Sequence, residues 1–533
     1  MAALISLLLS CGGDAVEKAV TPQVEELSPV QLLSRASLDL RGVRPTLQEI
    51  EAVEKDPAAL DTMLDGFVDD PRFGARVRAL FSSVYLTRQD AWDVTAEDFG
   101  LVDEPAFAAA VGEEPLRVLS TIAEQDLPYY ELVTGDWTMA NEVLGEAYPV
   151  DYPLGETGWK QVHYTDGRPA AGVLATNGFW WHYGSNLTNS NRGRANAVSK
   201  VLLCNDYLSR PIEFSRDVNL LDRDALNDAL SNNPGCAACH VTLDPLASYL
   251  WGFYYLNTTS RVDASVYHAE RERLWQIYTN VAPGYYGEPG TTLTDLGWQI
   301  AADSRFPECV TQQVMEAMLQ RDVMLEDTEF LTQHREALLD NDMRLKPLFR
   351  SMIRDIAYRA SSSESPRYVP HKMMGPELLA SQIEDLTGFR FVYEGYDMMT
   401  TDSYGLRVLA GGVDGVYATR PAEFPTTTML LVQERLAQGA ASYVVDRDAT
   451  AESPRLFTEV KFTETPSTDR DAMVRQIQAL HLRMFGKRLA ADSQEVTDNL
   501  SLWEGLYAID GDAKAAWAGL ASVLMRDPDF ILY

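Results

Sequence analysis

Hydrophobic residues recur at helical spacing along most of this chain. Between Pro29 and Phe81 they fall three and four positions apart, Pro45-Thr46 opens a new segment, and Pro57 and Pro71 interrupt the pattern. The same spacing continues through residues 74–138, while residues 143–170 are rich in glycine and proline. The pattern therefore predicts a mainly α fold of several helical modules with long irregular loops.

The later part of the chain also has hydrophobic residues at helical spacing. The spacing predicts three helices between residues 293 and 359, at 293–302, 309–319 and 343–357, and a further helical module from Met374 onward. Leu38-Asp39-Leu40-Arg41-Gly42 and the later Leu480-His481-Leu482-Arg483 show the same order of signals, and each is followed by an Asp-Pro turn and a phenylalanine. This recurrence indicates a diverged repeat of one helical unit; chance reuse of common helix and turn motifs is the alternative.

Composition and charge narrow the class of protein. The 533 residues include 78 acidic and 45 basic ones, which gives a net charge of −33, and 46% are hydrophobic. A chain of this length is expected to form about three or four domains. The negative charge argues against nucleic acid and anionic surfaces as partners.

The first residues resemble a bacterial lipoprotein signal. A short apolar run ends in Leu8-Leu9-Ser10-Cys11, the pattern of a lipobox, although the positive residues that normally precede such a run are missing. A frayed apolar terminus is the alternative. We expect Cys11 to carry the lipid that anchors an exported protein to the bacterial outer membrane, on its periplasmic or surface face.

The stretch that points most directly to chemistry is Cys236-Ala237-Ala238-Cys239-His240. The pattern C-x-x-C-H is typical of covalent attachment of c-type haem, in which two thiols bind the porphyrin and the histidine binds iron. Residues three and four apart share a helical face, so Cys236, Cys239 and His240 can point the same way. Asn233-Pro234-Gly235 is expected to start this helix, and Pro245 to end it near Asp244.

Three other interpretations of the two cysteines remain open. A thioredoxin-like redox pair needs a βαβ context, which is not evident here. Half of a zinc site would need further ligands, such as Cys204 or Cys309. The pair can also be a strained disulfide or two inert thiols. Export would meet the conditions for haem attachment. The oxidising environment outside the cytoplasm would also favour a structural disulfide between Cys204 and Cys309.

Several other residues are candidates for the haem environment. Arg192 and Arg194 form a basic pair in an acidic chain, and their guanidinium groups suit the haem propionates; solvated surface charges are the alternative. A sixth iron ligand would have to come from a methionine or histidine, although each of these more often serves packing or surface roles. The candidates are Met315, Met318, His268 and His182.

The order of motifs resembles the planctomycete-type cytochrome c multidomain proteins, across most of residues 28–360 and more loosely beyond. The motifs that carry this resemblance are Leu38 to Gly42 with Pro45-Thr46, Thr138 to Leu144, Gly172-Val173-Leu174, Asn191-Arg192-Gly193, Leu202-Leu203-Cys204, Asn233 to Leu246, Asp303 to Phe306 with Cys309, and Leu345 to Arg359. The resemblance implies a helical fold with one c-type haem domain and no defined reaction. After Pro245 the chain departs from the family pattern, with Ala247 and Trp251 to Tyr254 in place of Gly and Glu-Asn-Phe-Asp.

These observations lead to an expected organisation. It comprises a signal and linker (residues 1–27), an N-terminal helical module (28–138), a cytochrome c-like domain with one haem c (139–290), a helical module (291–360) and a C-terminal helical module (361–533). The expected function is that of a lipid-anchored monohaem cytochrome that exchanges electrons with a partner protein outside the cytoplasm. A surface scaffold with a structural or vestigial haem motif, and a haem enzyme of peroxidase type, are the alternatives.

Overall fold

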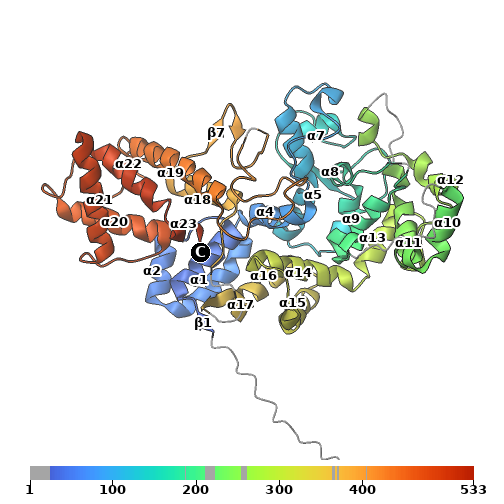
Figure 1. Cartoon of the computed structure of the whole chain (residues 1–533), viewed down its shortest axis with the longest axis horizontal. Helices are drawn as coiled ribbons and strands as arrows, with labels where there is room; N and C mark the ends of the chain where they lie inside the picture. The colour runs from blue at the N-terminus through green and yellow to red at the C-terminus, as the bar shows by residue number, and fades with distance from the viewer. Residues whose placement is uncertain are drawn as a thin grey trace, which may run out of the picture.

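The computed structural model describes residues 24–186, 188–209, 222–253, 261–362, 367–368, 371–403 and 405–533. Within these residues the fold is mainly α, as predicted, and the strands form only two-stranded sheets (Figure 1). The expected lipobox and Cys11 lie outside the described residues. In the described part, no helix is long and apolar enough to span a bilayer.

The helices are joined by connections of very different length, and the longest runs from the end of one helix at Thr387 to the start of the next at Thr427. The first eight are α1 (Pro29–Arg41), α2 (Leu47–Lys55), α3 (Leu60–Gly66), α4 (Phe73–Tyr85), α5 (Glu104–Glu124), α6 (Glu131–Thr134), α7 (Glu142–Ala147) and α8 (Asn177–His182). The next nine are α9 (Arg192–Leu203), α10 (Arg223–Asn232), α11 (Pro234–Ala247), α12 (Trp275–Tyr278), α13 (Leu293–Ala301), α14 (Arg305–Leu319), α15 (Thr328–Leu339), α16 (Leu345–Arg354) and α17 (Ile356–Arg359). The last six are α18 (Pro376–Thr387), α19 (Thr427–Asp448), α20 (Arg470–Phe485), α21 (Gln494–Asp510), α22 (Ala513–Leu524) and α23 (Pro528–Ile531).

Four antiparallel strand pairs join distant segments or close short hairpins. The pairs are β1 (Glu25–Glu26) with β6 (Ala360–Ser362), β2 (Thr138–Ala140) with β3 (Lys160–Val162), β4 (Gly284–Tyr285) with β5 (Glu288–Pro289), and β7 (Val392–Tyr393) with β8 (Tyr396–Asp397).

The N-terminal helices form where the sequence predicts them, because their ends are capped locally. Ser28 and Thr46 each accept a hydrogen bond from the amide three residues on and complete a capping box, which starts α1 and α2. Gly42 ends α1 with a φ of 74°, a left-handed conformation that glycine adopts without steric cost.

Two expectations for the middle of the chain were incomplete. The sequence pattern missed α15, because only His334 and Leu338 of this helix are buried and its apolar periodicity is weak. The helix expected over 343–357 is divided at Asp355, whose backbone is extended and whose carboxylate caps the amide of Ala357.

The predicted modules do not all have cores of their own. One hydrophobic cluster runs from Leu32 to Tyr358 and so combines parts of the three modules predicted between residues 28 and 360. A second cluster lies almost wholly in the C-terminal module, from Met373 to Ile531, and Leu38 of α1 belongs to it. Figure 1 shows the result: α20 to α22 lie at one end of the longest axis, α10 to α12 at the other, and α1 between them.

From Leu32 to Arg41 the first helix is buried on every side, because both clusters pack against it. Its Asp39 is 1% exposed and accepts hydrogen bonds from Lys372 Nζ, Tyr358 Oη and Tyr533 Oη, each at 2.7 Å. The buried carboxylate therefore has a cation and two hydroxyl groups as partners, as a charge in this environment requires. This network joins α1 to the C-terminal module.

Candidate functional site

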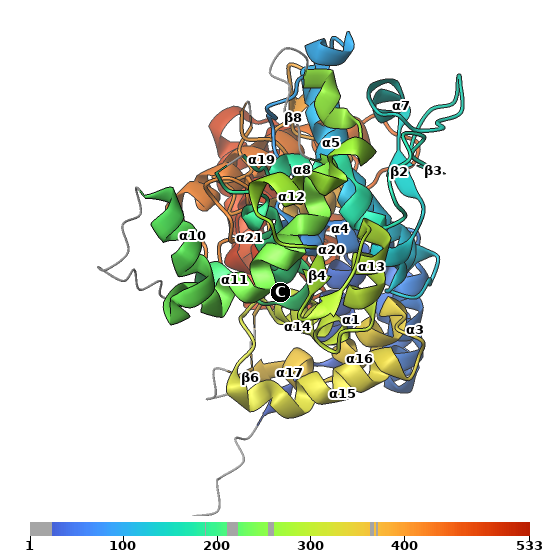
Figure 2. The ribbon, with the colours of Figure 1, turned by 90° about the vertical axis from the view of Figure 1, so that its right-hand side faces the viewer.

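The C-x-x-C-H motif lies in the first half of α11, at the end of the molecule that Figure 2 faces. The Asn233 side chain accepts a hydrogen bond from the Gly235 amide at 3.0 Å, and Pro234 occupies the first helical turn, so the expected turn does start the helix. Cys236 and Cys239 are free thiols of intermediate exposure. Because they are three residues apart on one helix, they lie on a shared face with His240.

The expected end of this helix at Asp244 is wrong. The helix continues through Pro245 to Ala247 and is followed by a 3-10 helix, Ser248–Phe253. Proline removes one hydrogen bond, to the carbonyl of Val241, and the side chain of Val241 is 67% exposed. We attribute the continuation to this exposure, because a carbonyl on the solvent side of a helix can bond to water instead.

Asp244 is the central polar residue of the site. Its carboxylate accepts a hydrogen bond from Nδ1 of His240 at 2.9 Å and two from Arg192, at 2.7 and 2.9 Å. Burial raises the pKa of Asp244, but the hydrogen bonds from Arg192 and His240 outweigh burial and keep the pKa below its usual value. With Nδ1 of His240 held by the carboxylate, Nε2 is the nitrogen that is available to a metal.

The two arginines of the predicted propionate pair have different surroundings. Arg192 reaches the C-x-x-C-H motif, although through Asp244, and its side chain is 21% exposed. Arg194 is 7% exposed, and its guanidinium group donates to the backbone carbonyls of Tyr183 and Phe253, at 3.0 and 3.2 Å. Through these bonds Arg194 joins α9 to the segments around it. Arg192 is thus the member of the pair that lies at the motif.

A second polar group holds the other side of α11. The hydroxyl of Tyr207 contacts the Thr242 hydroxyl at 2.7 Å and the Tyr286 hydroxyl at 3.1 Å, and Ser199 of α9 contacts Tyr286 at 3.2 Å. The sequence analysis identified neither this group nor the role of Asp244. The spacing of His240 and Asp244, four residues apart on a helix, was the signal that would have shown the pair.

A disulfide anchors α9, which packs against α11. Cys204 directly follows α9, Cys309 lies in α14, and their Cα atoms are 5.2 Å apart. This distance falls within the range of about 4.4–6.8 Å that disulfides require. The pairing is the one expected from the sequence, and it fixes the helix that carries Arg192 to the main core.

The two candidate histidines for the sixth position already have partners. Nδ1 and Nε2 of His268 lie 3.2 Å from the Glu270 carboxylate and 2.9 Å from the Asp263 carbonyl. Nδ1 of His182 accepts a hydrogen bond from the Gln89 amide. Burial lowers the pKa of His182 to about 4.

The two candidate methionines lie in the core. Met315 and Met318 of α14 are both 0% exposed and belong to the cluster that runs from Leu32 to Tyr358. On this helix face they fill apolar space between α14 and its neighbours, as methionine commonly does. Their placement favours packing over iron ligation.

The structure also bears on the other interpretations of the motif. The disulfide between Cys204 and Cys309 uses the two thiols that would complete a zinc site. Within the described ranges, no group of three His, Cys, Asp or Glu residues has an arrangement suited to a metal ion. Cys236 and Cys239 do not form a disulfide with each other, and α10 rather than a strand precedes their helix.

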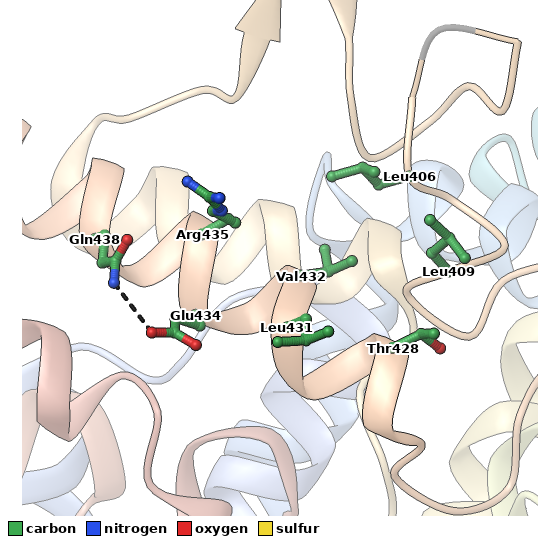
Figure 3. A pocket seen from close by; sticks show the side chains of 8 residues that line it. All are labelled: Leu406, Leu409, Thr428, Leu431, Val432, Glu434, Arg435 and Gln438. Atoms are coloured by element: carbon green, nitrogen blue, oxygen red, sulfur yellow. Dashed lines mark hydrogen bonds between the residues drawn. The ribbon is translucent and has the colours of Figure 1, made fainter.

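A cavity of about 520 Å³ lies elsewhere, on the surface of α19. Figure 3 shows Leu406, Leu409 and Leu431 on one part of its lining and the hydrogen-bonded Glu434 and Gln438 on another. Its lining residues all fall between 406 and 438, in the C-terminal module, so this cavity does not contribute to the site at the C-x-x-C-H motif.

Comparison of the chain with protein-family models, with curated proteins and with solved structures gives no match. The resemblance to planctomycete-type cytochrome c proteins therefore stays a prediction from the sequence.

Proposed function

We propose that the protein is a lipid-anchored monohaem c-type cytochrome that transfers electrons outside the cytoplasm. The observation that carries this proposal is the geometry of α11, where two free thiols share a face with a histidine whose Nδ1 is hydrogen-bonded to Asp244. Cys236 and Cys239 would form the thioethers, and Nε2 of His240 would bind the iron. A bound haem would supply the one-electron chemistry.

The surrounding residues fit such a group. A carboxylate that accepts the second N–H of a ligating histidine fixes the orientation of the ring and raises its basicity. Arg192 balances the charge of Asp244, and the disulfide holds α9 in place behind α11. In this arrangement Asp244 and Arg192 would orient His240 toward a bound iron without touching the metal themselves.

The test is the presence of covalently attached haem after export in a cell with haem-maturation machinery. The wild-type protein should stain for haem on a denaturing gel, and Cys236→Ala or Cys239→Ala should each abolish the two-thioether product. The matched control is the double variant Cys204→Ala and Cys309→Ala, which removes the other two cysteines of the folded part and should keep the stain. A wild-type protein without covalent haem would refute the proposal and favour the scaffold alternative.

One observation favours a second candidate, a haem enzyme of peroxidase type. The histidine–carboxylate pair makes the ligand a stronger electron donor, while His268 and the two methionines are already engaged elsewhere. An iron without a sixth protein ligand is open to small molecules. Carbon monoxide added to the reduced protein distinguishes the two: a rapid spectral change supports the enzyme, and an unchanged spectrum supports the closed electron-transfer protein.

A further inference from the structure

The strongest unexplained feature outside the haem motif is the side chain of Arg44. It is 7% exposed, and within the described residues its Nε and Nη2 are buried without a hydrogen-bond partner. A desolvated guanidinium group without partners is costly, and burial lowers the pKa of Arg44 to about 10. Buried cations in proteins normally have an anionic partner, so the missing partner of Arg44 calls for an explanation.

Arg44 lines a pocket of about 230 Å³ that has an unusual concentration of positive charge. Three more arginines line the same pocket: Arg41, Arg72 and Arg483. Arg41 is paired with Glu49 at 2.7 Å and Arg72 with Asp70 at 2.7 Å, so their charges are balanced. Arg483 has no hydrogen bond or ion pair with any described residue.

The backbone adds to this positive character. Thr46, Leu47 and Gln48 form the N-terminal end of α2, and all three line the pocket. The capping box already uses the amides of Thr46 and Glu49. The amides of Leu47 and Gln48 and the positive end of the helix dipole are therefore what favour an anion. One carboxylate, that of Asp385, also lines the pocket, and Asp529 raises the pKa of Arg44 from nearby. The positive charge of two unpaired arginines and a helix N-terminus therefore exceeds the negative charge of the single lining carboxylate.

The pocket is formed where the two halves of the chain meet. Arg41, Arg44 and the start of α2 come from the N-terminal helices, whereas Asp385 comes from α18 and Arg483 from α20. Arg41 and Arg483 stand in the last turn of their helices, at the corresponding positions of the two stretches that suggested an internal repeat. A ligand in this pocket would contact both halves at once.

We propose that this pocket binds a phosphate-type oxyanion, either inorganic phosphate or the phosphate group of a small ester. Guanidinium groups match the oxygens of such an anion through paired, charge-assisted hydrogen bonds. Because a water molecule occupies about 30 Å³ in the liquid, a pocket of about 230 Å³ has room for a phosphate group and several waters. The anion would supply a counter-charge for the Arg44 guanidinium group, which has no ion pair with any described residue.

The test is calorimetric titration of the full protein with inorganic phosphate and, separately, with glycerol phosphate. Saturable one-site binding is expected, and Arg44→Gln or Arg483→Gln should each weaken it by about tenfold or more. The control is Arg488→Gln, five residues from Arg483, because this arginine pairs with Glu54 at 2.9 Å and does not line the pocket. It should leave the affinity within about twofold, since exposed pairs contribute little.

Each result of the titrations leads to a different conclusion. Binding of glycerol phosphate without inorganic phosphate identifies an ester as the ligand, and binding of inorganic phosphate shows that the free anion is sufficient. Absence of saturable binding for both would overturn the proposal, as would binding that survives both Arg44→Gln and Arg483→Gln. If Arg44→Gln fails to fold, the half-buried Arg483 still provides the decisive variant. None of these results depends on whether haem is attached.

Discussion

Two buried carboxylates, Asp39 and Asp244, differ in what surrounds them. Asp39 is 1% exposed, and its partners Lys372 and Tyr358 are equally buried and lie more than 300 positions away in the sequence. The partners of Asp244 are 23% and 21% exposed, and His240 lies only four residues away. The first carboxylate joins α1 to segments that are distant in the sequence. The second positions side chains that still reach solvent, as a ligand site requires.

Removal of the buried carboxylate should have the largest effect on stability. In Asp39→Ala, Lys372 loses its anionic partner in a buried environment, and we expect the free energy of unfolding to fall by about 3–5 kcal/mol. Chemical denaturation measures the change. The control is Asp69→Ala, because Asp69 is 54% exposed and pairs with Lys346 and Arg350 at the surface. The control should cost less than about 1 kcal/mol; equal costs for both variants would contradict the comparison.

Loss of the disulfide should have the next largest effect. Cys204 and Cys309 are 105 positions apart, so their bond strongly restricts the unfolded chain. The double variant Cys204→Ala and Cys309→Ala is expected to lose roughly 2–4 kcal/mol. A wild-type protein whose unfolding midpoint does not change on mild reduction would show that this bond does not contribute.

Acidification should destabilise the protein through His182. Burial lowers the pKa of this histidine from 6.5 to about 4, so the unfolded chain binds more protons between these values. Stability should therefore be lost as the pH falls from about 6.5 toward 4, by on the order of 2 kcal/mol because the side chain is only partly buried. His182→Gln should reduce this pH dependence in denaturation measured at pH 7 and pH 5. The same substitution at His163, whose side chain is 53% exposed, is the control; an equal effect there would refute the assignment.

The contrast between the two carboxylates also shows what the sequence could reveal. Local caps and apolar spacing predict the helices of the first 85 residues and the start of α11. The number of cysteines predicts the pairing of Cys204 with Cys309. The role of Asp39 does not, because its partners lie in segments that meet only in the folded chain. The same holds for the pocket at Arg44, since Arg483 reaches it from the opposite half.

The site itself was predictable in part. The pattern identified Cys236, Cys239 and His240 as candidates, and the acidic composition identified Arg192, but a haem site at these residues stays a prediction. Arg192 and Arg194 are two positions apart on α9 and so point in directions about 200° apart, which predicts different surroundings. Which neighbours each arginine meets could not be predicted, because those neighbours come from segments that are distant in the sequence. Asp244 was identified only as the residue before a proline, although its spacing from His240 suited a hydrogen bond.

The smallest predicted effect concerns the reduction potential of the haem, and it rests on the proposed attachment. The carboxylate of Asp244 lies next to the imidazole of His240, so its negative charge would stabilise the more positive ferric state. Asp244→Asn keeps the shape of the side chain but removes the charge, so the potential should rise. The expected change is about 60 mV, which corresponds to roughly 1.4 kcal/mol for one electron.

Arg192→Gln provides the complementary variant. It removes the cation that shares the carboxylate, so Asp244 should act more strongly on His240 and the potential should fall. Redox titration followed by absorption measures both variants against the wild type. Shifts in the same direction would show that the variants act only by loosening the site, and that Asp244 does not set the basicity of the histidine. Opposite shifts are expected if the charge at Asp244 sets the potential, because both substitutions remove a hydrogen bond but change the net charge in opposite directions.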